Sequence, residues 1–268
     1  MPLAAKPLAA KPFAAKAFQP VVAAAQFFAA GGRALVQTVL PPICLACKKP
    51  AGASGGLCSK CWQSAGFIER PYCERLGTPF SYDSGGPLIS PAAFADPPVF
   101  DRARSAMRFS DVARDLVHLL KYGDRLDLVK PFANWMTRAG DELLGEADAL
   151  VPVPLHWTRL FQRRFNQSAE LARAIAKQKK ISAIDDALAR VRATPPQVGL
   201  AREERAKNVH GAFAIEKNFR SKVKGKRIVL VDDVLTTGAT ANACARVLRR
   251  AGAAKVDVLT LARVVDQV

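Results

Sequence analysis

The stretch from Ile228 to Thr240, IVLVDDVLTTGAT, constrains the fold of this chain more than any other part of it. Its first four residues, Ile228 to Val231, are aliphatic and mostly β-branched, which is typical of a short strand buried in a parallel sheet. Two carboxylates, Asp232 and Asp233, follow at the end of this expected strand. Next comes a turn of small and hydroxyl-bearing residues: Thr236, Thr237, Gly238, Ala239 and Thr240. A helical pattern then begins and is expected to end near Gly252.

The residue types in this stretch favour a site for a phosphorylated sugar. Backbone N–H groups, threonine hydroxyls and a helix N-terminus attract an anion, and Gly238 lets the backbone approach it closely. Two carboxylates would repel the phosphate, so Asp232 and Asp233 suit sugar hydroxyls or the surroundings of Mg²⁺. The structural alternative is a strand that ends in a solvated turn with two ordinary surface aspartates. The order of strand, acid pair, Thr-Thr-Gly and helix favours the ligand site.

Other segments predict the same α/β class. Residues 99–109, 148–154 and 256–261 are expected to form strands, and residues 111–121 a helix. Alternation of strands and helices predicts a mostly parallel, twisted sheet flanked by helices, with the ligand at the carboxyl ends of the strands. We assign this domain to residues 99–268.

The cysteines are concentrated in one segment, since five of the six lie between positions 44 and 73. Four of them form two C-x-x-C units separated by ten residues: Cys44, Cys47, Cys58 and Cys61. This spacing is typical of a closed, tetrahedral site for structural Zn²⁺, and four unligated thiols are the alternative. Leu76 stands where a partner of Cys73 would be expected, so Cys73 is interpreted as a lone thiol rather than a ligand. Paired C-x-x-C units without a clear secretory signal favour a reducing cytoplasm.

The N-terminal segment repeats the pattern Pro, apolar, Ala, Ala, Lys over residues 1–20. Proline at this spacing breaks helices, so we expect a disordered tail, with a targeting signal as the functional alternative. Residues 21–80 are expected to contain a helix followed by the zinc ribbon. The sequence has no uninterrupted apolar run long enough to cross a bilayer, so stable membrane insertion is not expected.

The chain carries a formal net charge of +17, which points to polyanionic partners. Nucleic acid, phosphorylated ligands and an anionic membrane surface all fit this charge. Aromatic residues make up 7% of the chain and do not cluster along the sequence, which weighs against a strong base-stacking surface.

Four basic residues are candidates for contacts with pyrophosphate or DNA: Lys121, Arg163, Arg164 and Arg205. Lys121 lies at the end of a predicted helix, and the two adjacent arginines precede a helix expected to start near residue 166. Arg205 belongs to residues 194–213, which we expect to form an irregular loop able to close over a ligand. A solvated basic surface or a structural loop is the alternative in each case. His156 is interpreted as a turn histidine, and no residue is assigned as catalytic.

The Ile228–Thr240 stretch resembles the signature of type I phosphoribosyltransferases that binds 5-phosphoribosyl-1-pyrophosphate (PRPP). That signature has four hydrophobic residues, two acidic ones, two variable ones and then T-T-G-x-T, and every position matches. The resemblance implies that Asp232 and Asp233 hold the ribose 2′- and 3′-hydroxyls. It also implies that residues 236–240 wrap the 5′-phosphate and that Mg²⁺ lies on the pyrophosphate.

The order of segments over about residues 41–264 resembles the ComF family of competence proteins. The segments that carry this resemblance are CLAC, CSKCW, PYCERLGTPF, LKYGDRLDL and VPVPLHWTRLFQRRFNQSAELA, together with residues 197–213 and IVLVDDVLTTGAT. Many relatives have a further cysteine pair where this chain keeps Cys73. The resemblance implies a cytoplasmic role in natural transformation, in which incoming single-stranded DNA is handled alongside other DNA-uptake proteins.

Two functions are therefore considered. We favour a PRPP-binding protein of the ComF type that acts in DNA uptake, with structural Zn²⁺ and with Mg²⁺ bound alongside PRPP. The alternative is an active phosphoribosyltransferase that moves ribose 5-phosphate from PRPP to a nitrogen acceptor in nucleotide metabolism.

Overall fold

The computed structural model describes residues 42–265, apart from 53–54, 84, 124 and 195–200. The tail expected over residues 1–20 and the helix expected within 21–40 lie outside the described residues. By its internal contacts the chain divides into two units, Met1–Pro42 and Ile43–Val268. The second unit contains the ribbon cysteines and the Ile228–Thr240 stretch.

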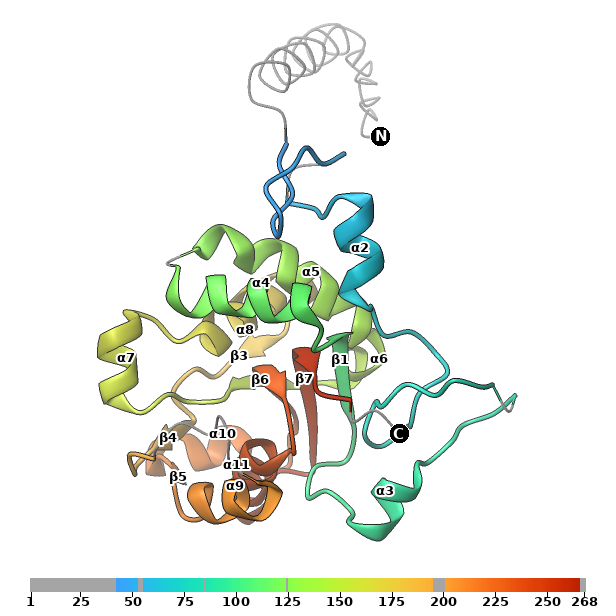
Figure 1. Ribbon diagram of the computed structural model, residues 1–268. Coiled ribbons are helices and arrows are strands. Elements are labelled where there is room, and N and C mark those ends of the chain that lie inside the picture. Colours follow the sequence, from blue (N-terminus) through green and yellow to red (C-terminus); the bar gives the residue numbers. More distant parts are fainter. Residues whose placement is uncertain (1–41, 53–54, 84, 124, 195–200, 266–268) are drawn as a thin grey trace, which may run out of the picture. The chain divides into compact units, whose positions relative to one another are not determined.

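The second unit is built on a parallel sheet, which confirms the predicted fold class. Within the described residues, five strands pair in the order β1-β7-β6-β2-β3, and each neighbouring pair is parallel (Figure 1). The strands are β1 (Ala103–Arg108), β2 (Ala149–Pro152), β3 (Ser182–Ala183), β6 (Arg227–Leu235) and β7 (Lys255–Arg263). Since β6 lies between β2 and β7, the residues that follow β2 and β6 meet at one edge of the sheet.

Helices cover both faces of this sheet (Figure 1). One face carries α4 (Asp111–Tyr122), α5 (Val129–Ala139) and α8 (Gln167–Lys179), and the other carries α10 (Arg220–Val223) and α11 (Ala239–Arg250). Alternate side chains of a strand point to opposite faces. Accordingly, Val229 and Val231 of β6 pack with the first group, while Ile228 and Leu230 pack with the second.

The remaining elements are short. The antiparallel pair β4 (Leu188–Arg190) and β5 (Phe213–Ile215) lies beside α11. Further elements are α2 (Ser59–Ala65), α3 (Pro91–Ala95), α6 (Asp141–Glu146), α7 (Trp157–Arg163), α9 (Arg202–Val209), η1 (Leu126–Leu128) and η2 (Lys217–Phe219).

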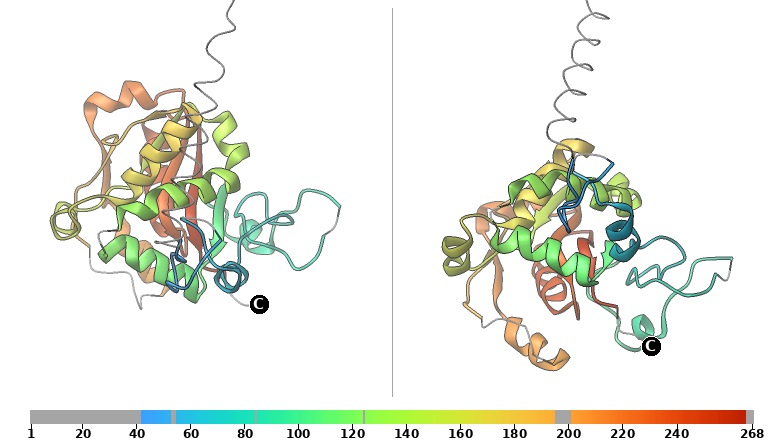
Figure 2. Two further views of the ribbon diagram at one scale, coloured as in Figure 1. Left: turned by 90° about the horizontal axis from the view of Figure 1, so that it is seen from above. Right: turned by 45° about the horizontal axis from the view of Figure 1, so that its top comes forward.

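The cysteine-rich segment packs directly on the sheet domain, beside α4 and α5 (Figure 2). Cys44, Leu45, Leu57 and Cys61 belong to the same apolar cluster as these two helices. Residues 66–68 then run antiparallel to β1, with the Ile68 N–H 3.0 Å from the Ala106 carbonyl oxygen. The ribbon therefore shares its core with the sheet.

Two local predictions are corrected by the structure. The strand predicted to end at Val231 continues to Leu235, because Asp232 and Val234 pair with β7. The irregular loop predicted over residues 194–213 is wrong for residues 202–209, which form α9. Acidic residues in its first turn stabilise the helix through its dipole. The Glu204 carboxylate also accepts a hydrogen bond from the Ala201 N–H at 2.7 Å.

Candidate functional site

The turn between β6 and α11 has the properties of an anion site. Gly238 adopts a left-handed conformation, with φ of 80°, and no side chain caps the helix that starts after it. First-turn N–H groups of a helix have no intrahelical partner, so they point toward an anion at this position. Thr237 Oγ1 is buried and has no hydrogen-bond partner within the described residues. A phosphate oxygen would give this hydroxyl the acceptor it lacks.

The acid pair is held by contacts from two helices. The Asp233 side chain is largely buried and forms an ion pair with Lys121 at the end of α4, with Nζ 2.9 Å from Oδ2. Asp232 Oδ1 accepts a hydrogen bond of 2.9 Å from Ser168 Oγ in the first turn of α8. It accepts a second from the Asp233 N–H at 2.9 Å. The predicted contact residue Lys121 therefore lies at the acid pair.

The environment of Asp232 raises its pKa from 3.8 to about 7. Burial is the largest cause, and the adjacent Asp233 carboxylate adds to it. The Asp233 N–H, the Lys121 ammonium and the Ser168 hydroxyl oppose the rise. Ionised Asp232 is thus held at a cost in folding stability.

Arg163 is connected to the same site through two neighbours. One guanidinium nitrogen donates to Tyr122 Oη at 3.1 Å, and another donates to Gln167 Oε1 at 3.3 Å. Tyr122 follows Lys121, and Gln167 precedes Ser168. Contacts between α4, α7, α8 and β6 therefore bring Lys121 and Arg163 close to the acid pair.

The other two predicted basic contacts belong to separate elements. Arg164 ends α7 in a left-handed conformation with φ of 64°. Arg205 is half-buried on α9, a helix that packs against α11. Contacts of these arginines with a ligand stay a prediction. His156 caps α7 by accepting the Thr158 N–H at 3.4 Å, in agreement with its interpretation as a turn histidine.

The structure adds Arg190 of β4 to this region, which sequence reasoning missed. Both Arg159 of α7 and Arg190 donate to Thr194, the former to its carbonyl oxygen at 3.0 Å. Burial lowers the pKa of Arg190, and the positive charge of Arg159 lowers it further, while Asp232 opposes the change. Like charges gathered in this way favour an anionic ligand. Nothing in the sequence marks Arg190, because its position depends on the pairing of β4 with β5.

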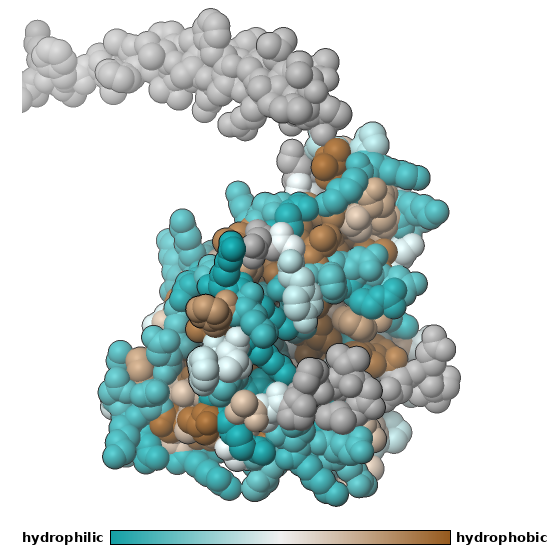
Figure 3. Space-filling model, turned by 60° about the vertical axis from the view of Figure 1, so that its left-hand side comes forward, coloured by the Kyte–Doolittle hydropathy of each residue, from teal (hydrophilic) through white to brown (hydrophobic). Residues whose placement is uncertain are grey.

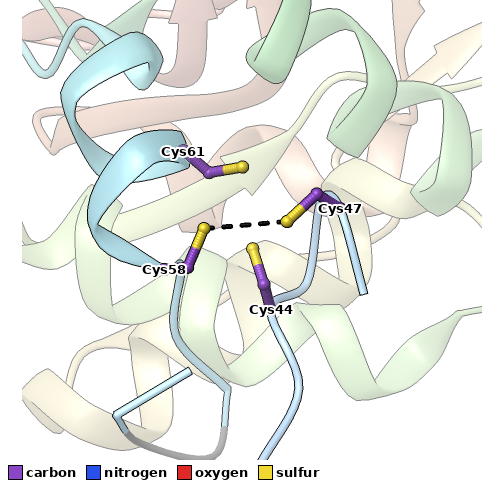
Figure 4. Close-up of side chains that lie close together, drawn as sticks. All are labelled: Cys44, Cys47, Cys58 and Cys61. Atoms are coloured by element: carbon purple, nitrogen blue, oxygen red, sulfur yellow. Dashed lines mark hydrogen bonds between the residues drawn. The ribbon is translucent and has the colours of Figure 1, made fainter. Parts of the chain in front are cut away.

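The predicted zinc ligands converge. The Sγ atoms of Cys44, Cys47, Cys58 and Cys61 all lie within 4.8 Å of one another, and those of Cys47 and Cys58 are 3.6 Å apart (Figure 4). Tetrahedral Zn²⁺ with bonds of about 2.3 Å requires sulfur separations of about 3.8 Å, so the four thiols fit the ion. Within the described residues, this is the one cluster of three or more groups able to hold a metal.

A second turn around Cys73 repeats the geometry of the first without its ligands. The Cys44 N–H bonds the Lys49 carbonyl at 2.7 Å, and the Cys73 N–H bonds the Thr78 carbonyl at 2.8 Å. Cys73 Sγ is buried and accepts the N–H groups of Leu76 and Ser90, at 3.4 and 3.2 Å. Burial acts to raise the pKa of Cys73, but its hydrogen bonds outweigh this effect and lower it. Cys73 Sγ thus has two backbone donors, and its interpretation as a lone thiol stays a prediction.

Helix α7 presents apolar side chains to solvent next to its arginines. Trp157 and Phe161 are 71% and 87% exposed. The side of the molecule that carries α7 shows brown hydrophobic residues among teal hydrophilic ones (Figure 3). Among the described residues, no helix has both the length and the hydropathy needed to span a bilayer.

Replacing one zinc ligand is expected to remove the metal and lower the stability of the whole second unit. The free energy of binding a structural zinc contributes to the free energy of folding. Because the ribbon shares an apolar cluster with α4 and α5, its loss of order would also weaken the packing of these helices. Cys47→Ser should abolish stoichiometric zinc, measured by mass spectrometry, and lower the melting temperature. Cys73→Ser is the control and should keep one zinc per chain. Two zinc ions in the wild type, or zinc loss in the Cys73 variant, would contradict this assignment.

Asp232→Asn is expected to stabilise the folded protein in a pH-dependent way. Asp232 has a higher pKa in the folded state, about 7, than its usual 3.8, so its ionisation opposes folding increasingly as pH rises between these values. Asparagine does not ionise and keeps the oxygen that accepts from Ser168. The melting temperature should rise by a few degrees at about pH 8 and be unchanged near about pH 3. Equal shifts of the melting temperature at both pH values would contradict the burial argument. The control is Asp111→Asn, at an exposed carboxylate of α4, which should not show this pH dependence.

Comparison with known proteins agrees with both parts of the structure. The Double zinc ribbon domain family matches residues 35–91, and the Phosphoribosyl transferase domain family matches residues 166–267. "DNA utilization protein YhgH" of Salmonella typhimurium is 31% identical over 84% of this chain and 98% of its own length. "Competence protein F" of Haemophilus influenzae is 26% identical over 79% of this chain and 92% of its own length.

A solved structure described as "the allosteric regulatory enzyme of purine biosynthesis" is 24% identical, with a TM-score of 0.37. The match covers 53% of this chain and 29% of that one. The sequence relatives, in contrast, match along nearly their whole length. The ribbon cysteines, the phosphoribosyltransferase-type sheet and these relatives show that the chain belongs to the ComF family.

Proposed function

We propose that this protein binds PRPP at the β6–α11 turn and acts in DNA uptake by handling single-stranded DNA in the cytoplasm. The observation that carries the PRPP part is the buried hydroxyl of Thr237, which has no partner among the described residues and lies in a turn next to the acid pair. A ligand with a phosphate and a free diol complements this combination. Residues 236–240 would hold the 5′-phosphate, and Asp232 and Asp233 the ribose hydroxyls.

Basic side chains beside the acid pair would receive the pyrophosphate. Lys121 and Arg163 are connected to the acid pair by the contacts described above, and Arg159 and Arg190 lie within electrostatic range of each other. Mg²⁺ prefers several oxygen ligands, and the acid pair offers only two carboxylates. Mg²⁺ would therefore bind together with the pyrophosphate, where it would neutralise charge.

Several features support the DNA part of the proposal. The net charge of +17 favours a polyanion, and zinc ribbon and sheet form one compact unit. The relatives carry the names "DNA utilization protein" and "Competence protein F". A four-cysteine zinc site requires reduced thiols, which favours the cytoplasm. Exposed Trp157 and Phe161 would suit other DNA-uptake proteins as partners.

The second candidate is an active phosphoribosyltransferase, and the clustered arginines favour it because they would stabilise a leaving pyrophosphate. In that reaction the bond from C1 of the ribose to pyrophosphate breaks as a bond from C1 to an acceptor nitrogen forms. Pyrophosphate release from Mg²⁺ and PRPP, measured with a panel of bases, ammonia and glutamine, separates the candidates. Acceptor-dependent release that Asp232→Asn with Asp233→Asn abolishes would establish the transferase.

Thr237→Val tests the PRPP site with two opposite effects. Valine keeps the shape of threonine but removes the unpartnered buried oxygen, so the free energy of unfolding should rise by roughly 1 kcal/mol. PRPP affinity, measured by calorimetry with Mg²⁺, should fall about tenfold because one hydrogen bond to a charged phosphate is lost. Thr137→Val on α5 is the matched control and should leave PRPP affinity unchanged. Absence of PRPP binding by the wild type would refute the assignment.

Binding to single-stranded DNA is expected to depend on salt. Each phosphate contact with a lysine or arginine releases counterions, which gives a slope of about −0.7 per contact in log affinity against log salt. Fluorescence anisotropy of a labelled oligothymidylate, with full-length zinc-loaded protein, measures this slope. A protein that fails to bind even at low salt would rule out the DNA part and leave the PRPP part standing.

A further inference from the structure

A groove between the ribbon and the sheet domain collects aromatic rings that are scattered along the sequence. Its volume is about 560 Å³. Trp62 comes from α2, Phe67 and Tyr72 from the segment after it, and Trp135 from α5. Folding thus creates an aromatic cluster that the sequence did not reveal.

The rings form a stack with an open end. The centroid of Trp62 is 4.3 Å from that of Phe67, with an interplanar angle of 33°. Phe67 and Trp135 form a T-shaped pair, with a centroid separation of 5.4 Å and an interplanar angle of 79°. Phe67 and Trp135 are half-buried, but Trp62 is 45% exposed. Trp62 therefore rests on Phe67 and keeps nearly half of its surface accessible to solvent.

Cations line the same groove. The Arg70 guanidinium lies over the Tyr72 ring, 4.7 Å from its centroid, and Arg138 of α5 projects into solvent with 74% of its side chain exposed. Arg138 pairs with Glu69, whose side chain is 68% exposed. Because ion pairs between exposed groups are weak, a phosphate can replace Glu69 at little cost.

We propose that this groove binds single-stranded nucleic acid by stacking an unpaired base on Trp62, with Arg138 on the neighbouring phosphate. Base stacking on aromatic rings beside basic residues is the general chemistry of single-strand binding, and it tolerates any base sequence. The groove lining carries two arginines, both ion-paired, and one glutamate, and the chain as a whole has a net charge of +17, which favours a polyanion. An acidic or apolar peptide would use the cations or the rings, but a nucleic-acid strand uses both. The inference rests on the proposed DNA function and assigns a surface to it.

The test compares two labelled probes of equal length and charge, an oligothymidylate and an abasic oligodeoxyribose phosphate. Trp62→Ala should bind the oligothymidylate about tenfold more weakly than the wild type, because it loses one stacking partner. Its affinity for the abasic strand should be unchanged. Trp62→Leu keeps apolar volume against Phe67 and should show the same base-dependent loss, while Trp62→Phe should retain most of the binding. Arg138→Gln should reduce the slope of log affinity against log salt by the value of about one phosphate contact, and it should do so with both probes.

Phe94→Ala removes an aromatic ring that is 75% exposed outside the groove, and it should bind both probes as the wild type does. Zinc content and melting temperature verify that each variant is folded. If the Trp62 variants bind oligothymidylate as tightly as the wild type does, the groove is not the binding site and DNA must bind elsewhere on the protein. Equal losses on both probes would overturn base stacking. A wild type that binds neither probe would remove the DNA function itself.

Discussion

Two adjacent carboxylates near the end of a buried strand are the constraint on which this structure depends. Like charges in a site of low polarity repel each other and lose solvation, so each needs a partner from another element. Lys121 provides a charge for Asp233 from the last turn of α4, and Ser168 provides a hydroxyl for Asp232 from the first turn of α8. These contacts fix two helix ends against β6. The same helix ends position Tyr122 and Gln167, which in turn hold Arg163. One electrostatic requirement therefore organises most of the candidate ligand site.

Contiguous features could be predicted from the sequence, because their chemistry is local. The β6–α11 turn, the strand before it and the four clustered cysteines each lie within a short segment, and the parallel sheet follows from the alternation of strands and helices. Features that depend on tertiary packing could not be predicted. Arg190 reaches the site through the β4–β5 pairing, and the Trp62–Phe67–Trp135 stack joins residues on separate elements. Helix α9 was missed because the two prolines before it outweighed the charge pattern that favours a helix.

The two turns of the ribbon segment are held in different ways. Around Cys44, four thiols converge with the spacing that zinc requires. Around Cys73, leucine replaces the second cysteine, and the thiol accepts two backbone N–H groups instead. Buried Arg104 strengthens this second turn from the sheet side, since it pairs with Glu74 and Glu142 and lies over the Tyr72 ring. Within the described residues, hydrogen bonds and ion pairs thus hold this second turn.

The packing of α2 against α4 connects the metal to the ligand site. Helix α4 shares an apolar cluster with the ribbon and carries Lys121 in its last turn, where the ammonium pairs with Asp233. Loss of the ion expected at the four cysteines would weaken this packing on α4, in line with the lower stability predicted for the second unit. Helix α4 therefore acts as a mechanical link, because a shift in its packing against α2 would also move the Lys121–Asp233 ion pair at its end.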